Sequence, residues 1–167
     1  IESLPYIESV RQMIWDLGRE NAIVIHLTLI PFLAAAGELK TKPTQHSVKT
    51  LMESGISADI IVCRTEHELS EDLREKLALF CNVKRESIIQ SIDVETIYDV
   101  PLKMLEEGLD RVVLNKLQLK PKKALDLKPW NDFLFKFKNP KHSVKIGLVG
   151  KYVELQDSYK SILESLI

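Results

Sequence analysis

The sequence has little of what marks several common classes of protein. Its only cysteines, Cys63 and Cys81, stand on separate predicted elements, with no CxxC spacing and no histidines clustered around them. This pattern disfavours a disulfide framework and a metal site, and it favours reduced thiols in a core. No apolar run approaches the roughly 18 residues that cross a bilayer, and no signal peptide opens the chain. We therefore expect a cytoplasmic protein with no membrane partner.

A strong charge of one sign is missing as well. The net charge is −1 with a pI of about 6.5, so the molecule as a whole attracts neither nucleic acid nor anionic lipid, and any polyanion binding has to be local. The sequence also lacks a glycine-rich phosphate loop and a paired nucleophile and base. Because it starts at Ile1 and stops inside an amphipathic run, we expect it to be cut from something longer.

Hydrophobic periodicity predicts alternating helices and strands. Apolar residues at helical spacing between Ser3 and Gly18 predict a helix with one face packed on a sheet. Nearly continuous, β-branched apolar runs predict strands at 22–30, 59–64 and 87–92. Helices are predicted from about Pro43 to Gly55 and over 69–80. This alternation predicts an α/β fold with a parallel sheet and flanking crossover helices.

The second half of the chain has a different pattern. Residues 98–119 predict two short helices broken at Gly108, with Asp110 as the N-cap of the second. The proline-punctuated, lysine-rich stretch 120–142 predicts a linker with one docked helix. Its lysines and aromatic residues could also stack on nucleic acid, but the four-residue spacing of Phe133 and Phe137 favours packing on a neighbour. A further strand and turn are predicted over 144–152, and a helix over 157–167, as the opening of a second domain.

One polar segment, residues 37–47, interrupts this apolar pattern and ends at a predicted helix start. Lys40 and Lys42 offer two positive charges, and the free N–H groups of a helix opening near Pro43 add oriented donors, an arrangement that suits a polyphosphate. The alternative is an ordinary solvated loop before a helix. In parallel sheets, ligands bind at the carboxyl ends of the strands, where this segment and the Asp93–Val94 turn both fall.

Isolated polar residues elsewhere have simpler interpretations beside a functional one. His26, inside a predicted strand, fits a hydrogen-bonded core histidine better than a ligand. Glu2 could be an acid in the first turn of a helix, and Arg11 a surface cation. Lys76 could be the solvated partner of Asp72, four residues before it.

Five blocks of sequence closely resemble the CTP synthase family, in order and at fitting intervals. They are residues 1–5, 37–48, 79–83, 97–101 and 147–152. Members of this family join an amidoligase (synthetase) domain of P-loop type to a glutaminase domain. The resemblance implies a three-layer parallel sheet with flanking helices as a partial domain. It divides the chain into the C-terminal half of the amidoligase domain (1–119), the interdomain linker (120–142) and the start of the glutamine amidotransferase domain (143–167).

The resemblance also implies a reaction. In this family of pyrimidine-biosynthesis ligases, ATP phosphorylates the uracil 4-oxygen of UTP, and ammonia released from glutamine displaces the phosphate to give CTP. The implied partners are UTP, the feedback inhibitor CTP, ATP, and glutamine at the second domain. A homotetramer and Mg²⁺ are implied too, with the metal ligands outside this chain.

Site residues follow from the same resemblance. The triphosphate of UTP and CTP is expected on the segment from Lys40 to Gln45 and on Lys76, with Glu2 at the nucleoside. The full expected set for UTP and CTP is Glu2, Lys40, Thr41, Lys42, Pro43, Thr44, Gln45 and Lys76. The ATP set is Ile92, Asp93 and Val94, although other members carry a basic residue where Ile92 stands. Lys40 is the expected catalytic residue, because it is best placed to stabilise charge developing in phosphoryl transfer.

Three functional hypotheses remain open at this point. The first is a ligase whose activity needs the full chain, so that this fragment alone is inactive. The second is a non-catalytic nucleotide-binding and assembly module. The third keeps the α/β topology in an unrelated P-loop switch protein that depends on a nucleotide.

Overall fold

A computed structural model describes residues 3–167, so the predicted site residue Glu2 lies outside the described part. The chain divides into two compact units, the first ending at Lys123 and the second running from Ala124 to Ile167. No helix of residues 3–167 is both long enough and apolar enough to cross a bilayer.

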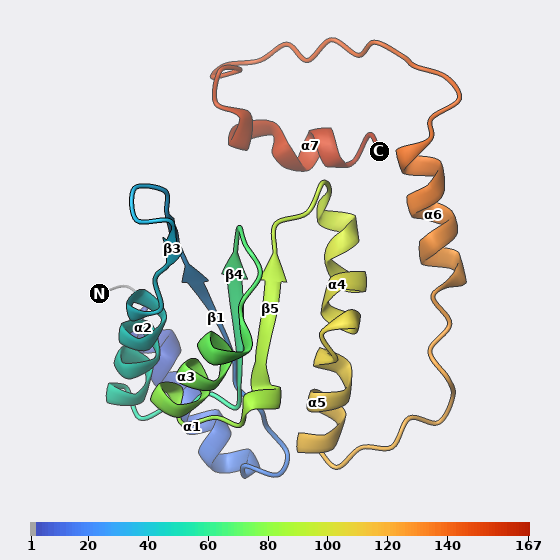
Figure 1. Ribbon diagram of the computed structural model, residues 1–167. Helices are drawn as coiled ribbons and strands as arrows, with labels where there is room; N and C mark the ends of the chain where they lie inside the picture. The colour runs from blue at the N-terminus through green and yellow to red at the C-terminus, as the bar shows by residue number, and fades with distance from the viewer. Residues whose placement is uncertain (1–2) are drawn as a thin grey trace. The chain divides into compact units, whose positions relative to one another are not determined.

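The first unit is built on a parallel sheet of three strands in the order β1-β4-β5, which confirms the predicted sheet. These strands are β1 (Ile25–Ile30), β4 (Ile60–Thr65) and β5 (Ile88–Ile92) (Figure 1). The central strand β4 is buried at every position except Arg64, as expected of a strand covered on both faces. Ile30, Thr65 and Ile92 are partners in register, so the three carboxyl ends lie in one row.

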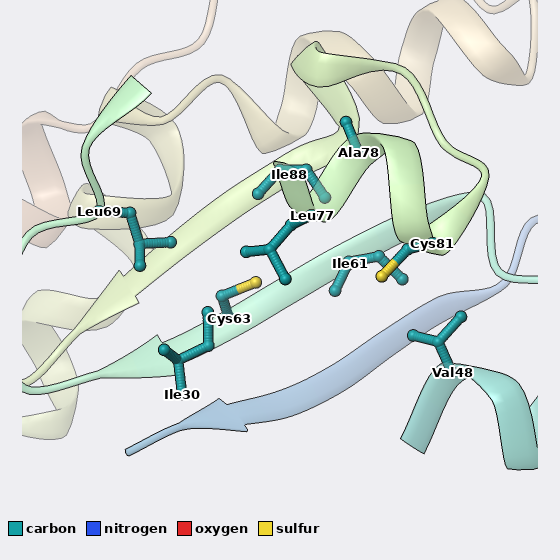
Figure 2. Close-up of a cluster of buried hydrophobic side chains, with 9 residues drawn as sticks. All are labelled: Ile30, Val48, Ile61, Cys63, Leu69, Leu77, Ala78, Cys81 and Ile88. Carbon is teal, nitrogen blue, oxygen red and sulfur yellow. The ribbon is translucent and has the colours of Figure 1, made fainter. Parts of the chain in front are cut away.

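Helices cover both faces of this sheet. On one face, side chains from α2 (Lys42–Glu53) and α3 (Glu71–Cys81) pack on the strands. Figure 2 shows this cluster, in which Leu77 lies over Cys63 and Cys81 lies beside Ile61. On the other face, α4 (Val100–Glu106) and α5 (Leu109–Lys116) pack on Ile60, Val62 and Ile89. The resulting arrangement is helix, sheet, helix.

Both cysteines are free and buried in the first of these clusters, as predicted. Burial raises the pKa of the Cys63 thiol to about 12 and that of Cys81 to about 11. Since a thiol reacts as its thiolate, both side chains are inert components of the core.

Two predictions about helices in the first unit are wrong in detail. Helix α1 (Leu4–Leu17) forms, but it buries none of its residues, and its apolar side chains, including Trp15 at 82% exposure, face outward. Helix α1 does not pack on the one part of the sheet that α2 to α5 leave uncovered, the face of β1 on which Ile25, Leu27 and Leu29 are exposed. The N-cap of α5 is Gly108, with φ +78°, and the expected N-cap Asp110 lies inside the first turn of the helix.

The second unit contains α6 (Lys128–Lys138) and α7 (Lys160–Glu164), with a 3-10 turn over Gln156–Tyr159. The helix predicted in the linker is confirmed, and the Phe133 and Phe137 rings stack with centroids 6.1 Å apart. The strand predicted over 144–152 is wrong, since residues 143–150 carry no regular structure and Val149 is 97% exposed. A strand needs a partner for its backbone hydrogen bonds, and none pairs with this segment in the described chain.

Candidate nucleotide site

The basic segment predicted as a loop is anchored by a short hairpin. Strands β2 (Phe32–Leu33) and β3 (Glu38–Leu39) pair antiparallel, and the backbone N–H of Lys40 donates to the carbonyl of Pro31 at 2.9 Å. The turn between them closes through Gly37, whose φ of +63° favours glycine. Lys40 therefore emerges from a fixed stem, a feature that the sequence analysis missed. The sequence signal for this hairpin was a glycine, Gly37, between two short segments that contain apolar residues, 32–33 and 38–39.

Helix α2 starts immediately after this stem. Thr41 is the N-cap and Pro43 occupies the first turn, where a missing N–H costs nothing. The N–H groups of a first turn have no acceptor within their own helix, and the helix dipole places partial positive charge there. The predicted helix start is thus confirmed, and its donors open next to Lys40 and Lys42.

Two threonines predicted at the site are buried. The Thr41 hydroxyl accepts a hydrogen bond from the Gln45 amide at 3.1 Å. Thr44 is completely buried, and its hydroxyl bonds to the carbonyl of Leu29 at 3.0 Å and to the Thr28 hydroxyl at 3.2 Å. These hydrogen bonds attach the start of α2 to the end of β1. The buried Thr44 side chain thus holds the helix start in place.

Lysines from two separate elements act on one carboxylate beside the hairpin. Lys40 Nζ donates to Glu38 in an exposed ion pair. The Lys40 hydrogen bond lowers the pKa of Glu38, and the charge of Lys76 on α3 adds to that shift. Lys40 is thus the direct partner of Glu38, and Lys76, 36 positions later in the sequence (76 − 40), acts on this carboxylate through its charge alone. Asp72, the alternative partner of Lys76, forms no ion pair with it in residues 3–167.

The turn after β5 joins the same edge of the sheet. Asp93 donates its backbone N–H to the carbonyl of Thr65 at 3.0 Å, and its carboxylate pairs with Arg64 Nε at 3.4 Å. Arg64 also lines a cleft of 420 Å³ together with Pro43 and Ser47. It thus connects the start of α2 with the turn that contains Ile92, Asp93 and Val94. Sequence reasoning missed Arg64, although it is the one charged residue within β4.

The remaining polar residues have local partners. His26 bonds to the Ser47 hydroxyl at 2.9 Å, and burial lowers its pKa, which confirms a hydrogen-bonded histidine within the fold. Arg11 forms an exposed, bidentate ion pair with Glu8 on α1. Across residues 3–167, no three acidic, histidine or cysteine side chains gather in a way that could hold a metal ion.

Comparison with known proteins gives a consistent result along the whole chain. A sequence profile described as CTP synthase N-terminus matches residues 1–119. Proteins named CTP synthase from Flavobacterium psychrophilum and Flavobacterium johnsoniae are 80% and 74% identical over all 167 residues. One from Bacteroides fragilis is 59% identical over 166 residues. The chain spans 31% of the length of each of these relatives.

The match also corrects one expectation about location. Residues 1–119 are assigned to the N-terminal region of the matching proteins. This assignment replaces the expected placement in a C-terminal half of the first domain.

Proposed function

The chain belongs to the CTP synthase family, and from that premise we propose that the longer protein containing it is a ligase that makes CTP from UTP, ATP and the ammonia of glutamine. The observation that carries the proposal is that Lys40, Lys42 and the start of α2 lie together, directly after the hairpin that follows the carboxyl end of β1. Ligands of parallel α/β sheets bind at this edge. The proposed substrates are UTP and ATP, with CTP as a competing inhibitor and glutamine acting at a second domain.

The triphosphate of UTP is bound by positive charge from three directions. Lys40 and Lys42 flank Thr41, the N-cap of α2, and Lys76 on α3 supplies the third charge in this proposal. Free N–H groups at the start of α2 add donors that point along the helix axis. Phosphate oxygens replace Glu38 as the partner of Lys40, because a triphosphate offers more negative charge than a single exposed carboxylate.

Lys40 is the proposed catalytic residue. Transfer of a phosphoryl group from ATP to the uracil 4-oxygen spreads negative charge over the transferred oxygens and the leaving group. A cation that is already held in place stabilises that charge without reorganising in the transition state. The stem of β2 and β3 and the bond from Lys40 N–H to Pro31 provide this fixed position.

The other predicted residues have supporting roles in this proposal. Thr41, Thr44 and Gln45 hold the start of α2 through their own hydrogen bonds, and Pro43 presets the first turn. Ile92, Asp93 and Val94 form the ATP side, and Glu2 orients the nucleoside of UTP. When bound, Mg²⁺ would neutralise phosphate charge; residues 3–167 form no cluster of ligands for it. The assembled protein is proposed to be a homotetramer.

The test is Lys40→Ala in the full-length protein. CTP formation from UTP, ATP and ammonia should fall by about a hundredfold or more, because one prearranged charge stabiliser is lost. Glutamine hydrolysis should survive, since the change lies outside the second domain. The matched control is Lys49→Ala, an exposed lysine on α2 paired only loosely with Glu53 at 4.0 Å, and it should leave both reactions unchanged. CTP formation at the wild-type rate in Lys40→Ala would refute the proposed role.

A further inference from the structure

A polar network away from the candidate nucleotide site links α3 to β5 and to the end of α4. At its centre is Arg74, whose side chain is only 10% exposed. Its guanidinium donates to both carboxylate oxygens of Glu107, from Nη1 at 2.6 Å and from Nη2 at 3.1 Å. This is a bidentate contact between a planar guanidinium and a carboxylate, and it fixes the relative orientation of the two groups as well as their distance.

Both partners of this pair also hold backbone groups. Arg74 donates to the carbonyls of Leu69 and Ile88, each at 3.4 Å. Glu107 accepts from the backbone N–H of Gln90 at 3.0 Å. The side chain of Gln90 then accepts from the N–H of Leu69 at 2.6 Å, which closes a ring of bonds. This ring of hydrogen bonds joins α3, the residue Leu69 before it, β5 and the end of α4.

Stability alone is a weak reason for such a network. Withdrawing two charges from water costs several kcal/mol, and an apolar pair of similar volume often stabilises a fold equally well. Burial works to raise the pKa of Glu107, yet the bonds from Arg74 and from Gln90 N–H outweigh it and hold the pKa below its ordinary value. The pair is therefore ionised, and it specifies one geometry between the elements that it joins.

Those elements carry residues of both proposed nucleotide subsites. Lys76 stands two positions after Arg74 on α3, and Asp93 stands three positions after Gln90 beyond β5. A shift of α3 against β5 would therefore move the proposed triphosphate cation relative to the proposed ATP turn. Each nucleotide would then lose contacts in its own subsite, and lost binding contacts raise KM.

We propose that Arg74 and Glu107 are positioning residues, which hold α3 and the carboxyl end of β5 in register so that both nucleotides bind in the geometry of transfer. The inference rests on the proposed function, because it assigns Lys76 to UTP and the 92–94 turn to ATP. Arg74 and Glu107 would then affect the reaction indirectly, by fixing the positions of α3 and β5, and would not contact either nucleotide.

Steady-state kinetics of the full-length protein test the inference through Glu107→Ala. We expect the KM for UTP and the KM for ATP both to rise by about tenfold, because the variant releases both elements at once. Glutamine hydrolysis should be unchanged. The matched control is Glu106→Ala, which removes the neighbouring glutamate and its exposed pair with Lys103 at 2.8 Å. This control should leave both KM values within about twofold of the wild type.

The KM values separate positioning from simple loss of fold. A variant that only lowers the amount of folded enzyme reduces the apparent kcat and leaves both KM values unchanged. The conservative variant Glu107→Gln keeps an oxygen for Gln90 N–H and should restore part of the loss. It also decides the question if Glu107→Ala fails to fold: a rise in both KM values supports the inference, and unchanged values overturn it.

The outcome is independent of the test on Lys40. If Lys40→Ala abolishes CTP formation while folded Glu107 variants keep wild-type KM values, the inference fails and the proposed function stands. If Lys40→Ala retains full CTP formation, the proposed function fails whatever the Glu107 variants show.

Discussion

At the scale of single residues, the hydroxyl of Thr44 determines where the start of α2 lies. It is completely buried and bonds to Leu29 and Thr28 of β1. The proposed phosphate-binding N–H groups begin two positions earlier, at Lys42. The buried Thr44 hydroxyl thus controls the direction in which those N–H groups point.

Thr44→Val is expected to loosen this attachment. The substitution keeps the shape of the side chain but leaves the Leu29 carbonyl without its bond from Thr44, at a cost of about 1–2 kcal/mol. Hydrogen exchange of the α2 amides should accelerate accordingly. Thr50→Val is the control on the same helix, because Thr50 is exposed and bonds only to the carbonyl of His46. Equal exchange rates in the two variants would contradict the anchoring role.

The roles of individual residues could be predicted from the sequence only in part. The types and spacing of Lys40 and Lys42 predicted an anion site, since lysine charge does not depend on fine packing, whereas Lys76 was expected there only from the family resemblance. Their surroundings could not be predicted. Arg64 and Thr28 join the candidate site through contacts with distant segments, to Asp93 and Thr44 respectively, and no local pattern in the sequence encodes those contacts.

At the scale of elements, the Arg74–Glu107 pair makes the junction of α3, β5 and α4 sensitive to acid. The folded protein binds the Glu107 proton less readily than the unfolded chain, because the pKa of Glu107 lies below its ordinary value of 4.5 in the fold. The unfolded chain therefore takes up the proton first as pH falls. The stabilisation is fully present above the ordinary value and is lost as pH falls through the folded pKa.

Glu107→Gln should accordingly destabilise the protein in a pH-dependent way. At about pH 7 we expect a loss of about 3 kcal/mol in the free energy of unfolding, because the charge of Arg74 is left buried without its partner. The difference in the free energy of unfolding between variant and wild type should shrink below about pH 4, as Glu107 of the wild type becomes protonated. Thermal unfolding at the two pH values measures both quantities. A difference that is independent of pH would show that the ion pair is not its source.

Element boundaries followed from the sequence wherever apolar periodicity and turn residues agreed. The three strands and the helices α2 and α3 lie within a few residues of their predicted positions. The failures have one cause in common. The periodicity of α1 and the β-branched run at 144–152 describe faces that need a partner, and local sequence does not reveal whether the partner is present.

At the scale of the whole molecule, the two units are connected by chain that lacks regular structure. Helix α5 ends at Lys116 and α6 begins at Lys128. Residues 119–126 between them are exposed, and residues 139–155 of the second unit are irregular as well. The protein thus offers exposed backbone to proteases on both sides of α6.

Limited digestion with trypsin should show this directly. The first cuts are expected after Lys122 or Lys123 and within 139–155, because exposed, unpaired backbone is cleaved most easily. The bonds from Lys120 to Pro121 and from Lys128 to Pro129 should resist, since trypsin does not cleave before proline. Mass spectrometry of the fragments identifies the sites. An early cut between Ile25 and Lys116 would mean that the first unit is less stable than its packing indicates.

The bond between Glu107 and the N–H of Gln90 has a further consequence, which concerns aggregation. Strand β5 is an edge of the sheet, and free N–H groups on an edge can pair with a strand of another chain. The carboxylate occupies one of these donors, so β5 is a poor template for strand addition. The opposite edge is β1, which pairs only with β4 in the part of the chain that the structure describes, and Ile25, Leu27 and Leu29 are exposed on one face of it. Intermolecular β-pairing in overproduced or partly unfolded protein is therefore expected to begin at β1.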